Sequence, residues 1–302
     1  MKKSLLLILL IGLVISSCAK SEIKRDEIIF ASNIIKYNST LKVLDNEWSA
    51  ADSIGIYMFA NEEQTIVENA ENIPYITTKG GKTGAFVPKG RVIYFPHGGD
   101  QVRFMAYYPY NPNVVGGMYK INVSDQSNQS AIDLLYSFDP NALYSKEFRN
   151  EKVLLKFDHM LSKVIINVKK GQGFENKDIE KIEIALIGMN RTADFKLSGT
   201  EFQNYTNKGD IIPQKTAVNK GYVVSYEAII LPTLDVLCAQ IVFDLKNKSK
   251  EDGMDSDVFK WNLETTLARS TKYTYNVTIN RSDIEVETIA ENWSQSEEIE
   301  SN

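Results

Sequence analysis

The chain has 302 residues, with 34 lysines and arginines against 39 aspartates and glutamates and a net charge of −5. Both signs are dispersed along the chain, so no basic face of the kind that binds nucleic acid is expected. Two histidines and two cysteines leave few residues from which to build a metal site. This composition indicates a mildly acidic exterior and excludes nucleic acid as a partner.

The first 17 residues have the order of a secretory signal peptide. Lys2 and Lys3 precede an apolar run over Leu5–Ile15, and two serines and Cys18 follow it. A run of about 11 residues is too short to span a hydrocarbon core of ~30 Å. The residues before Cys18 resemble a bacterial lipobox, which predicts removal of residues 1–17 and acylation of Cys18; the alternative is a chance cysteine. Acyl chains on Cys18 would tether the mature protein to a membrane.

About 285 residues remain without the signal peptide, which favours two domains over one. The polar stretch Asn141–Asn150 is the predicted linker. We therefore expect an N-terminal domain over residues 18–145 and a C-terminal domain over residues 146–302. Cys238 lies among apolar neighbours and is expected to be a buried thiol, and with Cys18 acylated no intramolecular disulfide can form.

Short strands separated by turn residues dominate the pattern, which predicts an all-β protein built of sandwiches. One strand carries Val164, Ile166 and Val168 on a single face, as a half-buried strand does. The predicted strands are Glu27–Ala31, Asp52–Ala60, Arg91–Phe95, Gln101–Tyr108, Met118–Val123, Ile132–Ser137, Val153–Phe157, Lys163–Lys169, Ile179–Ile187, Thr192–Leu197, Tyr222–Leu231, Cys238–Leu245, Val258–Leu263, Lys272–Asn280 and Ile284–Thr288.

Several segments resemble, in order, those of the fimbrillin family of Bacteroidales, the subunits and anchors of type V pili. Trp48–Met58 is similar to that family's "W…D.IG.YM" segment and Arg103–Tyr110 to its "F.AYYPY" strand. The remaining matches are Asp133–Ser137, Phe157–Val164, Ile230–Pro232, Tyr273–Val277 and Ile289–Trp293.

The resemblance implies two tandem transthyretin-like β-sandwich domains after a lipoprotein signal peptide, and export to the outer membrane at the cell surface. It also implies that a protease, typically specific for arginine, removes the first strand. A strand of another fimbrial subunit then fills the groove by β-augmentation, since the exposed backbone groups need partners. The expected role is a fimbrial subunit or anchor, with a host or bacterial surface ligand for adhesion.

The chain departs from the family around the expected cleavage site. No arginine lies between Arg25 and Arg91, and Lys42 occupies the region where an arginine is usual. Cleavage after Arg25 would remove the lipid but keep the predicted first strand. Cleavage at Lys42 would release that strand, and an uncut chain would stay on the membrane as an anchor or a non-polymerising relative.

The segment near the end of the chain is the candidate donor strand. Its alternate residues Ile284, Val286, Thr288 and Ala290 form a modest apolar set. Trp293 follows, and then a tail over residues 294–302 that is rich in glutamate and serine.

No nucleophile elbow, phosphate loop, dinucleotide fingerprint or zinc-protease pattern occurs, so the chain is not expected to be an enzyme or to need a cofactor or a metal. His97 and His159 are interpreted as structural. The acidic loop over residues 251–257 is interpreted as solvated, with calcium binding as the alternative. Tyr107, Tyr108 and Tyr110 are interpreted as core or edge residues, with a sugar-stacking platform as the alternative. The competing function is therefore a glycan-binding surface lipoprotein that does not polymerise, and a surface hydrolase is the third candidate.

Overall fold

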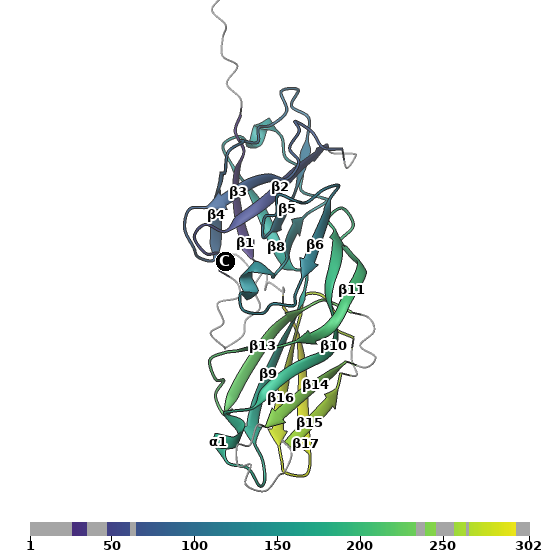
Figure 1. The fold of residues 1–302 in the computed structure, drawn as a ribbon. Coiled ribbons are helices and arrows are strands. Elements are labelled where there is room, and N and C mark those ends of the chain that lie inside the picture. Colours follow the sequence, from purple (N-terminus) through teal and green to yellow (C-terminus); the bar gives the residue numbers. More distant parts are fainter. Residues whose placement is uncertain are drawn as a thin grey trace, which may run out of the picture.

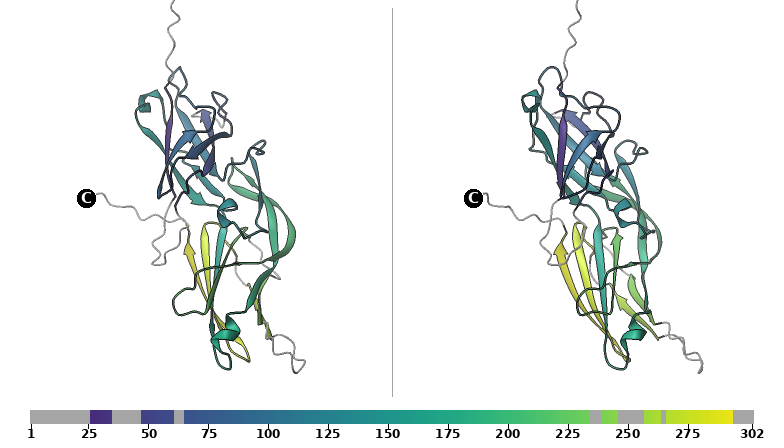
Figure 2. Two further views of the ribbon diagram at one scale, coloured as in Figure 1. Left: turned by 60° about the vertical axis from the view of Figure 1, so that its left-hand side comes forward. Right: turned by 90° about the vertical axis from the view of Figure 1, so that its left-hand side faces the viewer.

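The computed structural model describes residues 26–34, 47–60, 65–233, 239–245, 257–263 and 266–293. It confirms the all-β prediction, since the helical elements in these residues are one four-residue α-helix, α1 (Asn176–Ile179), and two 3₁₀ turns, Gln129–Ala131 and Lys146–Phe148. The strands form two units that are stacked end to end (Figures 1 and 2). In this part of the chain no helix is long and apolar enough to cross a membrane.

The first unit is a closed barrel, in the order β1-β4-β3-β2-β5-β7-β8. Its strands are β1 (Ile29–Ile34), β2 (Ser53–Ala60), β3 (Ile73–Thr77), β4 (Thr83–Pro88), β5 (Val102–Tyr108), β7 (Leu135–Phe138) and β8 (Lys152–His159). Closure comes from β1, which pairs antiparallel with β4 and parallel with β8. The sequence predicted a sandwich of two separate sheets for this unit. The two ladders of β1 instead join the strands into a single closed sheet.

The second unit is a sandwich of two five-stranded sheets. One sheet has the order β11-β10-β14-β15 with β6 also paired to β10, and the other has the order β12-β13-β9-β16-β17. The strands are β6 (Met118–Asn122), β9 (Ser162–Lys170), β10 (Glu183–Lys196), β11 (Glu201–Ile211), β12 (Gln214–Lys215), β13 (Val224–Ile230), β14 (Gln240–Leu245), β15 (Asp257–Asn262), β16 (Thr271–Ile279) and β17 (Ile284–Asn292).

Each unit contains a strand from the other side of the predicted division between residues 145 and 146. β6 lies before that point yet pairs with β10, and β8 lies after it yet pairs with β1 and β7 in the barrel. The domain ranges stay a prediction, and the pairing ties the two units together through segments from both sides of the predicted division.

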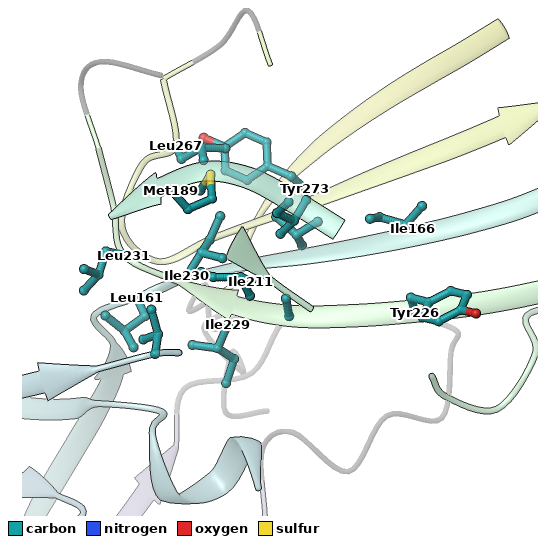
Figure 3. Close-up of a cluster of buried hydrophobic side chains, with 14 of the residues drawn as sticks. Leu161, Ile166, Met189, Ile211, Tyr226, Ile229, Ile230, Leu231, Leu267 and Tyr273 are labelled. Atoms are coloured by element: carbon teal, nitrogen blue, oxygen red, sulfur yellow. The ribbon is translucent and has the colours of Figure 1, made fainter. Parts of the chain in front are cut away.

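The buried apolar side chains form two cores, and the larger one also takes in barrel residues such as Tyr57 and Tyr107. The barrel core includes Phe30, Tyr75 and Phe104, and the sandwich core is centred on β9, β10, β13 and β16. The predicted alternation in β9 is confirmed, because Val164, Ile166 and Val168 are all fully buried. Figure 3 shows part of the sandwich core, where side chains from both sheets meet.

Several predicted strands differ from those observed. Residues 91–95 contribute a single bridge at Tyr94 in place of a strand. The predicted strand from Ile179 begins only at Glu183, since α1 ends at Ile179, and it continues through the predicted gap as far as Lys196. The strands β3, β4, β11 and β12 were not predicted.

Candidate strand-exchange site

β1 is held in the barrel by two backbone ladders. Phe30 to Asn33 pair with Phe86 to Thr83 of β4, and Ile29 to Ile34 pair with Lys152 to Phe157 of β8. Each ladder satisfies backbone N–H and C=O groups that would otherwise need another partner. Removing β1 would therefore open an edge on β4 and an edge on β8 at once.

The inner face of β1 is part of the barrel core. Ile28, Phe30, Ser32 and Ile34 are 0–7% exposed. The ring of Phe30 lies edge-on to the rings of Tyr75 and Phe104, with both centroid distances at 5.1 Å. Burying an aromatic side chain of this size stabilises a fold by about 1.5–3 kcal/mol. Loss of β1 would leave an apolar trough under the two open edges.

One residue on this inner face is poorly placed. The hydroxyl of Ser32 is buried, and among the described residues it has no hydrogen-bond partner. A buried polar group without a partner costs about 1–3 kcal/mol. The buried hydroxyl of Ser32 therefore makes β1 a less stable part of the barrel, and an apolar residue at this position would remove this cost.

Trp48 follows residues 35–46, which come after β1, and it binds this part of the chain to the barrel. The backbone N–H and C=O of Trp48 pair with Gly81 at 2.9 and 2.8 Å. Its ring lies edge-on to Phe86, Tyr108 and Phe157, with centroid distances of 5.1 to 5.5 Å. A cut between β1 and Trp48 would leave Trp48 attached to the barrel by these contacts.

The predicted maturation and lipidation residues lie outside the described residues. Cys18 and Arg25 precede residue 26, and Lys42 falls between Ile34 and Glu47. Their assignments stay predictions. Connectivity alone fixes the consequence of each cut: cleavage at Lys42 separates β1 from β2, and cleavage after Arg25 leaves them joined.

The predicted donor residues are part of a paired edge strand. Ile284, Val286, Thr288 and Ala290 lie in β17, which pairs antiparallel with β16 along all nine residues. Only Ile284 and Val286 on this face are half-buried, and Thr288 and Ala290 are exposed. The donor assignment stays a prediction, and the structure adds that β17 would have to leave β16 to serve another chain.

A buried polar cluster joins the barrel to the sandwich near the end of β1. His159 Nδ1 is 2.9 Å from Asp133 Oδ2, and the His159 ring stacks on Trp293 with a centroid distance of 3.9 Å. Lys163 is 1% exposed, and its Nζ is 2.6 Å from Glu227 Oε2 and 5.8 Å from the Trp293 ring. A cavity of about 250 Å³ borders this cluster.

This cavity brings together segments that are far apart in the sequence. It is lined by Ile34 at the end of β1, by Trp48, by Asp133 before β7, and by Lys163 and Trp293 of the sandwich. No sequence pattern predicted the buried Lys163 or its pair with Glu227. The end of β1, Trp48 and Trp293, the last described residue, therefore meet at one place.

The two histidines differ in their surroundings. His159 is fully buried in the polar cluster and His97 is exposed in its turn. No group of three or more histidine, cysteine or acidic side chains that could hold a metal is found in the part of the chain described here. Cys238 and residues 251–256 of the acidic loop lie outside the described residues.

The tyrosines of β5 do not form one exposed platform. Tyr107 is fully buried, and its hydroxyl donates to Asn72 Oδ1 at 2.7 Å. Tyr108 points to the other face and donates to Asp52 Oδ1 at 3.2 Å. Burial raises the pKa of both tyrosines well above the ordinary value. Tyr107 is therefore not available to stack on a sugar.

Comparison with known proteins identifies the family. The model of the family described as fimbrillin-like matches residues 41–293. A protein of Bacteroides uniformis, provisionally named fimbrium subunit Fim1C, is 27% identical over 276 residues, which is 87% of this chain and 84% of that protein.

Two solved structures share the fold. A crystal structure from Bacteroides uniformis, provisionally described as a cell adhesion protein, has a TM-score of 0.70 at 25% identity and covers 88% of this chain and 98% of its own. A second, from Bacteroides ovatus and described in the same way, has a TM-score of 0.66 at 18% identity and covers 89% and 98%. With a family match over most of its length, the chain belongs to the fimbrillin-like family.

Proposed function

We propose that the chain is a fimbrial subunit or anchor that assembles by β-strand exchange and supports cell adhesion. In this proposal β1 is the strand that is replaced, and an extended segment of a neighbouring subunit takes its place. The observation that carries the proposal is the position of β1, a first strand that closes the barrel between two ladders and buries one whole face. The similar Bacteroides proteins, described as fimbrial or adhesive, support it.

The energetics of the slot favour replacement. A strand that pairs with β4 and β8 recovers both ladders, and an apolar residue in place of Ser32 avoids the buried unpaired hydroxyl. That difference is worth about 1–3 kcal/mol in favour of the incoming strand. This difference contributes to driving exchange once the link between β1 and the rest of the chain is cut.

Lipid attachment at Cys18 gives two forms of the protein. A chain cut at Lys42 loses the lipid together with β1 and enters the fibre. An uncut chain keeps both and stays in the outer membrane as the anchor. Because residues 35–46 connect β1 to Trp48, the position of the cut decides between the two roles.

The test uses the mature chain with Cys18→Ser and a site-specific protease sequence in place of residues 39–44. After cleavage we expect mass spectrometry to show loss of residues 26–34 from the folded protein, together with a ladder of oligomers in size-exclusion chromatography. The matched control carries the same protease sequence in place of residues 21–25, so that cleavage leaves β1 attached, and it should stay monomeric. A cut protein that retains β1 and remains monomeric would contradict the proposal.

A further inference from the structure

The ladder that joins β7 to β8 in the barrel is short. These strands pair only at Leu135 with His159 and at Tyr136 with Asp158. Beyond that point they diverge around a cavity of about 380 Å³. Its lining includes Phe104, Phe138 and Tyr144 on one side and Val153 to Leu155 on the other.

β8 borders this cavity with a free edge. Lys152 to Phe157 pair with β1 on one side, and on the other side they have no ladder partner among the described strands. Successive residues of a strand direct their N–H and C=O groups to opposite neighbours. Alternate residues of β8 therefore direct these groups toward the cavity, where an extended chain can pair with them.

We propose that this groove binds residues 284–292 of a second copy of the chain as an additional strand on β8. The site is separate from the slot of β1 because it is open while β1 is in place. It therefore goes beyond strand exchange at β1 and needs no cleavage.

The outer faces of the two segments are complementary in charge and hydrophobicity. Lys152, Leu154 and Lys156 point outward from β8, and Leu154 is 43% exposed. In β17 the corresponding row is Glu287, Ile289 and Glu291, with Ile289 40% exposed. In each row two charged residues flank an apolar residue at a spacing of two residues. Opposite charges and the two apolar side chains therefore face each other in either strand direction.

The inner faces match as well. In residues 284–292 the alternate positions carry Ile284, Val286, Thr288 and Ala290. These would point into the groove over Phe104, Val153 and Leu155, which are at most 4% exposed. The free edge of β8 is six residues long, or about 20 Å at 3.3 Å per residue, so it can pair with six of the nine residues of this segment.

The segment is an edge strand in its own chain. β17 ends its sheet with β16 as its ladder partner, and its side chains are exposed or half-buried throughout. A copy that releases β17 loses the nine-residue ladder with β16, the Lys272–Glu291 ion pair and the half-buried contacts of Ile284 and Val286 with the sandwich core. In the groove the same residues recover a ladder on β8 and bury their apolar face.

The experiment uses a peptide of residues 284–292 and the uncut protein with Cys18→Ser. We expect saturable binding in fluorescence anisotropy. A peptide with a benzophenone group in place of Val286 should cross-link to Phe104, Tyr144 or Val153–Leu155. A scrambled peptide is the control for composition. Absence of binding, or cross-links on β4, would overturn the proposal.

A charge exchange tests the predicted register. The variant Lys152→Glu with Lys156→Glu should weaken binding of the native peptide about tenfold, the scale for two exposed ion pairs turned into repulsions. A peptide with Glu287→Lys and Glu291→Lys should recover most of that affinity with the variant. Equal affinity of both peptides for both proteins would overturn the register. Because β1 stays in place throughout, the result is independent of exchange at the β1 slot.

Discussion

The first and last strands described here are held in opposite ways. β1 lies between two ladders and buries Phe30 in the barrel core, whereas β17 has one ladder and buries no side chain fully. The barrel therefore depends on β1 to close, and the sandwich depends much less on β17. A chain that exchanges strands with its neighbours needs both properties: a slot that is costly to leave empty and a segment that is easy to release.

The largest expected effect is at the inner face of β1. Phe30→Ala should lower the free energy of unfolding by about 3–5 kcal/mol, because it removes a fully buried ring and leaves a cavity. Ile29→Ala is the matched control on the outer face, where the side chain is 47% exposed, and should change stability far less. Urea unfolding measures both, and similar losses would mean that β1 is not part of the core.

The next effect is at the end of β17. Trp293→Leu should cost about 2–3 kcal/mol, since it removes the ring that stacks on His159 and lies under Lys163. This would show that the strand is held mainly by Trp293, the residue that follows it, and less by contacts along its own length. A loss below that of the Val286 variant described next would contradict this view.

Within β17 itself the expected effect is small. Val286→Ala should lower stability by at most about 1 kcal/mol, because the side chain is only half-buried at the edge of the sheet. Thermal unfolding of Val286→Ala and Phe30→Ala, measured side by side, gives the difference in stability. A loss comparable to that of Phe30→Ala would remove the contrast between the two strands.

The smallest effect is pH-dependent and lies in β8, next to β1. Burial raises the pKa of Asp158 above its ordinary value of 3.8. The charged form is therefore disfavoured in the folded state. This unfavourable contribution is fully present at neutral pH, fades as the pH falls through the raised pKa of the folded state, and is gone below about 3.8. Asp158→Asn should stabilise the protein slightly at pH 7 and have no effect near pH 3, as measured by urea unfolding at both values.

The strand pattern was predictable where alternation is regular, and failed where a local feature hides it. Ile73–Thr77 contains Pro74, which argues against a strand, yet it pairs with β2 and β4. β10 was predicted as two strands, Ile179–Ile187 and Thr192–Leu197, whereas one strand runs through Gly188, which lies at a register shift between Leu186 and Met189. β11 is exposed along most of its length, so it has no apolar period to read.

The site was predictable in part. The sequence identified a first strand in the right place, although it put the strand at Glu27–Ala31 and the structure places it at Ile29–Ile34. The closure of the barrel and the meeting of Asp133, His159 and Trp293 depend on contacts between distant residues. No local pattern carries that information, which is why the polar cluster and the open edge of β8 were not predicted.

The state of β1 in assembled fibres shows whether this strand is exchanged. Fibres sheared from cells and outer membranes are separated, and mass spectrometry gives the N-terminus of this protein in each fraction. We expect fibre subunits to begin between residues 35 and 47 and to lack residues 26–34, while membranes hold chains that begin at an acylated Cys18. Fibres whose subunits retain residues 26–34 would contradict it.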